Sequence, residues 1–307
     1  MPTDASNFSV TMVIRSILYT TQQASESPYN YVPTEWVCIF FLTAYSISTA
    51  IHMGQALRYK LWWMIPTVTF AGILEIFGWS CRLWSSQSPE LLRPFEMQLF
   101  GTILAPTPLV AAYFIIFGRI TIHFGPQFSR LTPNMYIIVF FSLDTICLTI
   151  QAVGSVFAAE AVNEYKSPTL GGNIMLGGIS AQLFAIWVYL GLAAEFFLRR
   201  KYNAPFRRQV IKFGKGQRSM SKDVQCMIYA LGFCTICIII RSVYRTVELA
   251  DGWSGTVIST ESYFNWLDGG FVVVAMYTLN VIHPGIYLKS VDTSLPDEDK
   301  VNLSYVF

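Results

Sequence analysis

Long apolar runs alternate with short polar segments along most of the chain. A helix that crosses a bilayer needs about 20 mostly apolar residues, and seven stretches have this length. The predicted spans cover residues 34–57, 61–84, 95–122, 134–159, 171–198, 223–250 and 261–288. The pattern predicts an all-α polytopic membrane bundle of seven transmembrane helices, with tails at residues 1–33 and 289–307.

The composition agrees with this pattern. The chain is 53% hydrophobic and only 13% charged, whereas soluble domains carry about 25% charged residues. So few charges leave too little polar surface to cover a soluble globule of 307 residues, and an outer surface that faces lipid is expected instead. All six cysteines fall within the apolar spans, so a disulfide framework is not expected. The C-x-x-C of Cys234 and Cys237 is interpreted as ordinary helix packing.

Lysine and arginine indicate the orientation, because they are retained on the cytoplasmic side of membrane proteins. With the N-terminus outside, 15 of the 21 lie on the cytosolic side and 3 on the outer side. We therefore predict an external N-terminus and a cytosolic C-terminus. The triplet Asn7-Phe8-Ser9 is a glycosylation acceptor in the outer tail, which makes Asn7 the predicted glycosylation site.

The connection between the fifth and sixth spans is strongly basic, with nine cations between Arg199 and Lys222. These cations either only determine the topology or also attract anionic lipid of the inner leaflet, at about 1 kcal/mol for each one near the surface. Both interpretations remain open.

Ionisable residues inside the spans are the main candidates for function, since each costs about 3 kcal/mol on insertion scales and normally faces the bundle interior. Glu75 and Arg82 are seven residues apart on the second span, as are Glu261 and Asp268 on the seventh. The sixth span adds a stripe at helical spacing, formed by Arg241, Arg245 and Glu248. These charges are either a structural network of ion pairs or a polar cavity that opens toward the outer leaflet and receives a charged headgroup.

Further polar positions lie deeper in the bundle. Asp144 and Gln151 on the fourth span and Gln182 on the fifth either continue a polar path or form hydrogen bonds between helices. Pro106 and Pro108 lie in the middle of the third span. Proline removes a helix donor and favours a kink, and kinked helices recur where transporters bind and gate, so both prolines are gating candidates.

Motifs of catalysis are missing from the chain. There is no P-loop, no H-E-x-x-H and no G-x-S-x-G, and His52, His123 and His283 show no i, i+4 pair. We therefore expect no catalytic residue, metal site, cofactor or nucleic-acid partner.

Two alternatives to transport remain, a receptor or sensor that signals through the basic loop and an intramembrane zinc hydrolase. The end of the third span lacks the acidic-Arg-aromatic triplet of rhodopsin-like receptors.

Segments of six spans together resemble the fungal lipid-translocating exporter family. They are Glu75-x-x-Gly78-Trp79-x-x-Arg82; Leu104-Ala105-Pro106 with Gly118-Arg119-Ile120; Asp144 with Gln151 and Gly154; Gly177-Gly178 with Gln182; Ile240 to Arg245 with Glu248; and Glu261, Asp268 and His283-Pro284-Gly285. Trp79 stands where the family has tyrosine. Yeast members are linked to export of sphingoid long-chain bases, aminocholesterol resistance and porphyrin uptake. The resemblance implies a multi-pass plasma-membrane protein that moves, or protects against, amphiphiles.

These observations lead to the hypothesis of a transporter or flippase-like exporter of a lipid or other amphiphile, of the sphingoid-base, sterol-like or secondary-metabolite class. The expected partners are membrane lipids or an amphiphilic small molecule. Asp268 or Glu75 would take a cationic headgroup, and the arginines would take an anionic group or a partner carboxylate. The predicted substrate-binding residues are Glu75, Arg82, Asp144, Gln151, Gln182, Arg241, Arg245, Glu248 and Asp268.

Overall fold

A computed structural model describes residues 27–164, 166–206, 221–252 and 255–288, and in these ranges it contains helices and no strands. Seven helices in this part of the chain are long and apolar enough to cross a membrane. They comprise Glu35–Tyr59, Trp62–Gln87, Leu92–Phe124, Pro133–Ala161, Thr169–Lys201, Lys222–Asp251 and Glu261–Tyr287. The prediction of an all-α bundle of seven spans is confirmed, and each observed end lies within three residues of the predicted one.

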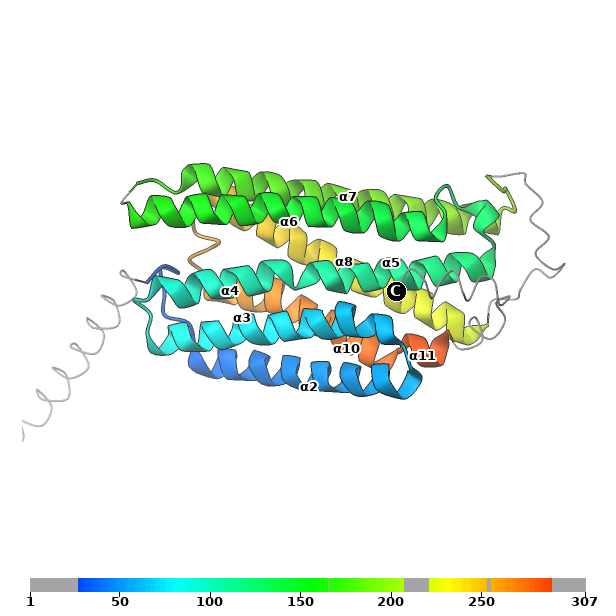
Figure 1. Ribbon diagram of the computed structural model, residues 1–307, viewed down its shortest axis with the longest axis horizontal. Coiled ribbons are helices and arrows are strands. Elements are labelled where there is room, and N and C mark those ends of the chain that lie inside the picture. The colour runs from blue at the N-terminus through cyan, green and yellow to red at the C-terminus, as the bar shows by residue number, and fades with distance from the viewer. Residues whose placement is uncertain (1–26, 165, 207–220, 253–254, 289–307) are drawn as a thin grey trace, which may run out of the picture.

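Four spans are single helices, and three are divided into shorter elements (Figure 1). The single helices are α2 (Glu35–Tyr59), α6 (Pro133–Asn163), α7 (Thr169–Lys201) and α8 (Lys222–Asp251). Span two consists of η1 (Trp62–Met64), η2 (Ile65–Thr69) and α3 (Phe70–Gln87), and span three of α4 (Leu92–Leu104) and α5 (Pro106–Phe124). Span seven consists of α9 (Glu261–Tyr263), η4 (Phe264–Gly270), α10 (Phe271–Val281) and α11 (Pro284–Tyr287), and η3 (Pro126–Phe128) follows α5.

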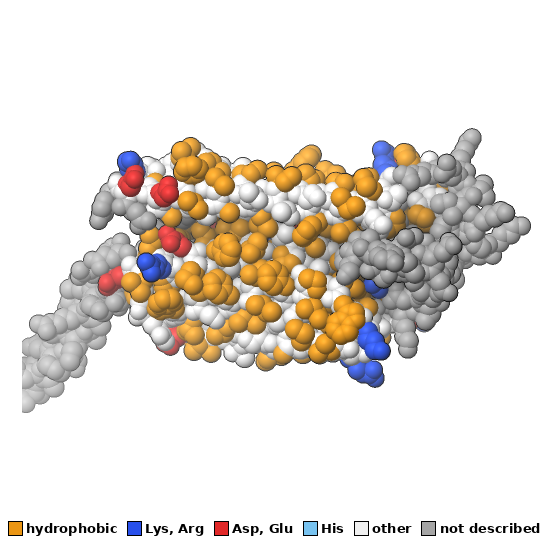
Figure 2. All heavy atoms as spheres, viewed as in Figure 1, with side chains coloured by type: hydrophobic (Ala, Val, Ile, Leu, Met, Phe, Trp, Pro, Cys, Tyr) orange, Lys and Arg blue, Asp and Glu red, His pale blue; other side chains and the backbone are white. Residues whose placement is uncertain are grey.

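Charge divides the described ends of the bundle into two kinds. At the end where α2 begins lie Glu35, Glu90, Glu96, Glu160, Glu164 and Asp251, against Arg93 and Lys166; we call this the acidic end. At the opposite end, called the basic end, lie Arg58, Lys60, Arg130, Arg199, Arg200, Lys201 and Lys222, against Glu195 and Asp223. Figure 2 shows most of the acidic side chains of this face at one end, basic ones at the other and an apolar band between them.

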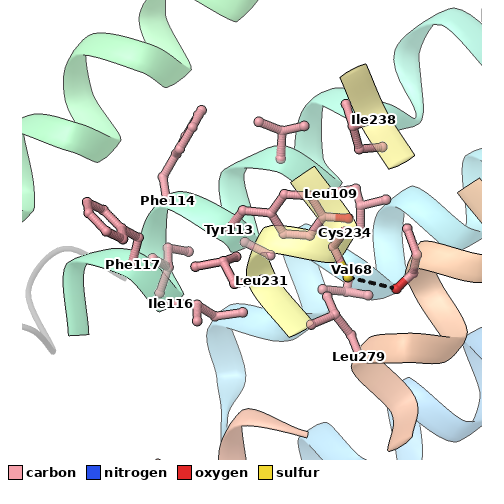
Figure 3. Packing of buried hydrophobic residues seen from close by; sticks show 14 of the residues in the cluster. Val68, Leu109, Tyr113, Phe114, Ile116, Phe117, Leu231, Cys234, Ile238 and Leu279 are labelled. Atoms are coloured by element: carbon pink, nitrogen blue, oxygen red, sulfur yellow. Dashed lines mark hydrogen bonds between the residues drawn. The ribbon is translucent and has the colours of Figure 1, made fainter. Parts of the chain in front are cut away.

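Helix α5 lies in the centre of the bundle, where every residue from Pro106 to Gly118 is buried. Its aromatic side chains join it to the neighbouring helices. The ring of Phe117 meets Tyr136 of α6 and Tyr189 of α7 edge-on, at centroid distances of 5.1 and 5.6 Å. Figure 3 shows this cluster continuing through Leu231 and Cys234 of α8 to Leu279 of α10. The thiol of Cys234 donates to the carbonyl of Ala275 at 3.4 Å. This cysteine of the C-x-x-C motif therefore contributes to helix packing.

Small residues let α6 and α7 approach closely, as is usual between membrane helices. A Cβ added to Gly171 would lie 2.4 Å from the backbone nitrogen of Ala158, and one added to Gly154 would lie 2.8 Å from the carbonyl oxygen of Gly171. Residues larger than glycine at these two positions would push the helices apart.

Three spans are irregular. Span three breaks at Ala105, directly before Pro106, which agrees with the predicted kink. Spans two and seven each contain a π-helical segment, η2 and η4, which the hydropathy pattern does not reveal. Such segments inside α-helices often occur at functional sites, because they redirect side chains.

Candidate functional site: a buried polar layer

Seven charged side chains lie inside the bundle, each no more than 6% exposed. We call them the buried polar layer: Glu75, Arg82, Asp144, Arg241, Arg245, Glu248 and Asp268. They come from α3, α6, α8 and η4, so the structure turns all seven charged residues of the predicted site toward the interior. The layer thus contains four acidic side chains and three arginines.

Arg82 occupies an aromatic cage beneath the acidic end. Its guanidinium carbon lies 4.4 Å from the ring centroid of Phe264 and 5.2 Å from that of Tyr29. The rings of Tyr31 and Trp79 are 5.6 and 5.7 Å away. Aromatic faces attract a cation most strongly where water is excluded, which explains how an arginine can be only 1% exposed.

The segment before α2 closes the acidic end above Arg82. The hydroxyl of Tyr29 donates to Gln98 of α4 at 2.9 Å and contacts Ser85 of α3 at 3.2 Å. Arg82 donates to the Tyr31 hydroxyl at 2.9 Å, and burial raises the pKa of the Tyr31 phenol. The sequence places residues 27–33 in the external tail, but their aromatic rings pack onto the bundle because they cover a buried cation.

Glu261 joins this closure to span seven. Its Oε1 accepts from the backbone nitrogen of Thr34 at 2.8 Å, and its Oε2 accepts from the Thr34 hydroxyl at 2.6 Å. The same Oε1 lies 3.4 Å from Arg82 Nη2. One carboxylate therefore holds the start of α2 and pairs with the buried arginine.

Arg241 connects three spans. Its Nε lies 2.6 Å from Oδ1 of Asp268, and its Nη2 donates to the carbonyl of Thr102. A helical carbonyl normally accepts from the nitrogen four residues later, but four residues after Thr102 stands Pro106, which has no N–H. The proline thus frees the acceptor that Arg241 uses. Pro106, predicted as a gating residue, has this structural consequence within the site.

The third ion pair lies within α8. Arg245 Nη1 donates to Oε2 of Glu248 at 2.6 Å, and the hydroxyl of Tyr244 donates to Oε1 of the same carboxylate at 2.9 Å. Nε and Nη2 of Arg245 are buried without a hydrogen-bond partner among the described residues. Arg245 therefore has two buried nitrogen donors without an acceptor among the described residues.

Two carboxylates of the layer, Glu75 and Asp144, form no ion pair with any described residue. Glu75 is 2% exposed and lies near Asp268 and Arg241. Asp144 is 4% exposed on α6. These two acidic side chains are the members of the layer that have no arginine partner among the described residues.

The predicted amides join the layer indirectly. Gln151 Nε2 donates to Gln182 Oε1 at 3.2 Å, and Gln182 Nε2 donates to the hydroxyl of Thr107 at 3.2 Å. Gln182 also lines a cavity of about 10 Å³ together with Pro106, Asp144 and Arg241. A cavity of this size holds at most about one water molecule, so the cavity at Asp144 excludes a lipid headgroup in this conformation.

The remaining predictions concern groups outside the layer. In the described part of the chain no three His, Cys, Asp or Glu side chains lie close enough to hold a metal ion. His283 Nδ1 accepts from the backbone nitrogen of Gly285 at 3.1 Å, and His52 Nε2 contacts the carbonyl of Met276 at 3.1 Å. Asn7 and residues 207–220 of the basic loop lie outside the described residues.

Sequence reasoning missed the contributions of Tyr29, Tyr31, Thr34 and Thr102 to the site. The tyrosines precede the first span in an otherwise polar segment, and nothing local indicates that they turn back onto the bundle. Thr102 takes part through its backbone carbonyl. Its role follows only from the proline four residues later.

Most of this chain is similar in sequence to known proteins. Residues 68–291 match the family model described as RTA1 like protein, and this match confirms the resemblance that the motifs indicated. The sphingoid long-chain base transporter RSB1 of Saccharomyces cerevisiae (strain JAY291) is 25% identical over an alignment covering 92% of this chain and 80% of that protein. The lipid-translocating exporter-like protein RTA1 of Leptosphaeria maculans is 26% identical, with 85% of this chain and 52% of that protein covered. The probable lipid transporter atnI of Emericella nidulans is 24% identical, with 84% and 67% covered. No solved structure matches the chain.

Proposed function

The chain belongs to the RTA1 like protein family, and from this premise we propose that it is a lipid transporter whose buried polar layer receives the polar head of an amphiphile. The names of the relatives, two lipid transporters or exporters and a sphingoid base transporter, favour transport over catalysis or signalling. We further propose that the protein resides in the plasma membrane, with the acidic end outside and the basic end in the cytosol. The basic end would contact anionic inner-leaflet lipid through the cations between Arg199 and Lys222.

The observation that carries the proposal is the excess of buried carboxylate. A charge buried in the bundle costs several kcal/mol unless it is paired, and a network with only a structural role would gain stability by losing Glu75 and Asp144. A cationic headgroup that enters the layer would balance these charges. The headgroup would meet Glu75 and Asp268 from one side and Asp144 from the other.

Access to the layer requires movement, because the cavity beside Asp144 holds no more than a water molecule. Three irregular places in the described spans provide sites for such movement: the break at Ala105, η2 and η4. We propose Pro106 and Pro108 as gating residues because they leave span three with fewer internal hydrogen bonds at this depth.

The test uses proteoliposomes that contain the full-length chain and a labelled long-chain amine. Glu75→Gln and Asp144→Asn remove the two unpaired charges with little change in shape. We expect the double variant to transport at least about tenfold more slowly, with thermal stability unchanged or raised because a desolvation cost is removed.

The control is Glu160→Gln, which neutralises an exposed carboxylate at the acidic end and should leave transport unchanged. Undiminished transport in the Glu75→Gln/Asp144→Asn variant would refute the role of the layer. Absence of transport by the wild-type chain for amine, sterol and zwitterionic lipid probes alike would refute the proposed function and favour the receptor alternative.

A further inference from the structure

A groove runs along the face of the bundle between α4 and α6, close to the acidic end. We call it the lateral groove. Its volume is about 680 Å³, which lies within the range of roughly 300–1,000 Å³ that small-molecule sites occupy. It is separate from the small cavity beside Asp144, and none of the ion pairs of the buried polar layer lines it.

The walls of the lateral groove are apolar. Leu99, Phe100 and Ile103 of α4 face Leu148 and Val156 of α6 across it. Phe100 is 54% exposed and Val156 57% exposed, so the groove opens sideways onto the apolar band, the surface that lipid chains cover (Figure 2). Between Leu92 and Leu104 it follows α4 for about 18 Å. This shape suits an extended alkyl chain.

The mouth of the lateral groove is acidic. Glu90, in the connection before α4, and Glu96, on its second turn, both line it. Neither carboxylate forms an ion pair or a hydrogen bond with another described residue. The nearest cation in the sequence is Arg93, which is exposed and does not line the groove. An apolar channel with two unpaired carboxylates at its end complements a molecule that has a cation at one end of an apolar chain.

The inner end of the groove connects with the buried polar layer through side chains. Gln151 lines the groove, and its Nε2 donates to Gln182 at 3.2 Å. Gln182 in turn lines the small cavity with Asp144 and Arg241. Residues on one side of this amide pair are accessible from lipid, and those on the other side are enclosed. The Gln151–Gln182 pair therefore separates a ligand in the groove from the small cavity at Asp144.

We propose that the lateral groove binds a single-chain amphiphile with a protonated amine. Glu90 and Glu96 hold the amine, and the alkyl chain lies between α4 and α6. This inference rests on the proposed lipid-transport function and adds to it a binding site outside the buried layer, with two residues that select for positive charge. Anionic amphiphiles are disfavoured at the mouth because two carboxylates repel them.

The experiment measures binding rather than transport. The full-length chain is placed in nanodiscs of phosphatidylcholine and labelled with a photoreactive alkylamine, with the alkyl alcohol and alkyl carboxylate of equal chain length as competitors. We expect crosslinks on α4 and α6 within the groove, and stronger competition by free alkylamine than by the alcohol. In Glu90→Gln/Glu96→Gln, the affinity for the amine should fall about tenfold or more, while that for the alcohol is unchanged.

Matched variants test whether a change in binding arises from the groove or from a general effect of the substitution. Glu160→Gln/Glu164→Gln removes two carboxylates at the same end that do not line the groove and should leave the affinity for the amine unchanged. Ser155→Phe fills the groove and should weaken binding of amine and alcohol alike. Thr149→Phe adds the same ring to the exposed face of α6, outside the groove, and should weaken neither.

Equal binding of the amine by wild type and Glu90→Gln/Glu96→Gln, tighter binding of the carboxylate, or crosslinks confined to other helices would each overturn the inference. The proposed function would survive such a result if proteoliposomes still transport lipid. Conversely, charge-selective binding in the groove without transport of any probe would support the site and overturn the proposed function.

Discussion

Asp268 and Arg241 meet inside the bundle with 2.6 Å between Oδ1 and Nε, and their side chains are only 3% and 7% exposed. Asp268 belongs to the π-helical segment η4 of span seven, and Arg241 belongs to α8. The same guanidinium reaches the Thr102 carbonyl that Pro106 leaves without a donor. A single arginine thus joins spans three, six and seven at the level where span seven is irregular.

Breaking this pair should be more harmful than removing it. Asp268→Asn leaves Arg241 buried without its counter-ion, which costs about 3–5 kcal/mol, whereas replacing both partners by apolar residues is often neutral. We expect a large fall in melting temperature for Asp268→Asn and recovery of most of it in Arg241→Met/Asp268→Leu, measured by thermal unfolding in detergent. Transport should be lost in both. A double variant as unstable as the single one would contradict this account.

Arg82 should not be replaceable by lysine. Its planar guanidinium contacts four aromatic rings and also donates to Tyr31, and a lysine ammonium cannot match this geometry. We expect Arg82→Lys to destabilise the chain by about 1–3 kcal/mol, seen as a lower melting temperature. Arg93→Lys, which changes an exposed arginine at the same end, is the control, and equal stability of the two variants would argue against the cage.

Two adjacent glycines of α7 should respond in opposite ways to alanine. A Cβ at Gly178 would lie 2.9 Å from the carbonyl oxygen of Cys147 and 2.7 Å from Cγ of Gln151, whereas one at Gly177 meets nothing within 4 Å. Gly178→Ala should therefore lower the melting temperature. Gly177→Ala should leave it unchanged or raise it, since alanine favours a helix over glycine by about 0.5–1 kcal/mol. Similar losses in both variants would show that α6 and α7 do not pack as described.

Glycosylation tests the predicted orientation. Asn7 lies in the predicted external tail and Asn302 in the predicted cytosolic tail, each in an N-x-S triplet. In a eukaryotic host, Asn7→Gln should remove the glycan and shift the chain to the mobility of the enzymatically deglycosylated protein. Asn302→Gln should leave the mobility unchanged. A glycan on Asn302 would show that the C-terminus lies outside, which contradicts the predicted orientation.

Hydropathy and spacing revealed much of the site because a membrane penalises buried charge wherever it occurs. Glu75 and Asp268 stand out in apolar runs for that reason, and both prove to be buried. The sequence did not indicate in the same way which residues these side chains contact. Glu75 and Arg82 share a helix face, yet Arg82 pairs with Glu261 and a cage of rings, whereas Glu75 lies near Asp268 and Arg241.

The groove and the closure of the acidic end depend on segments far apart in the sequence. Glu90 reads as an ordinary loop acid and Phe100 as an ordinary lipid-facing residue. They form one site only because the fold places α4 and α6 on opposite sides of the same groove. Tyr29 likewise covers α3 and α4 from a segment whose sequence resembles a polar tail.

The sequence by itself determined the number of spans and which positions would hold charge inside them, because the cost of polar groups in lipid acts on each helix separately. It also indicated the family through motifs spread over six spans. Tertiary structure alone decided which charges neutralise one another, which two carboxylates remain without an ion pair, and where the bundle opens to lipid. These properties depend on distances between helices, and those distances follow from side-chain packing, the proline break at Ala105 and the π-helical turn that carries Asp268.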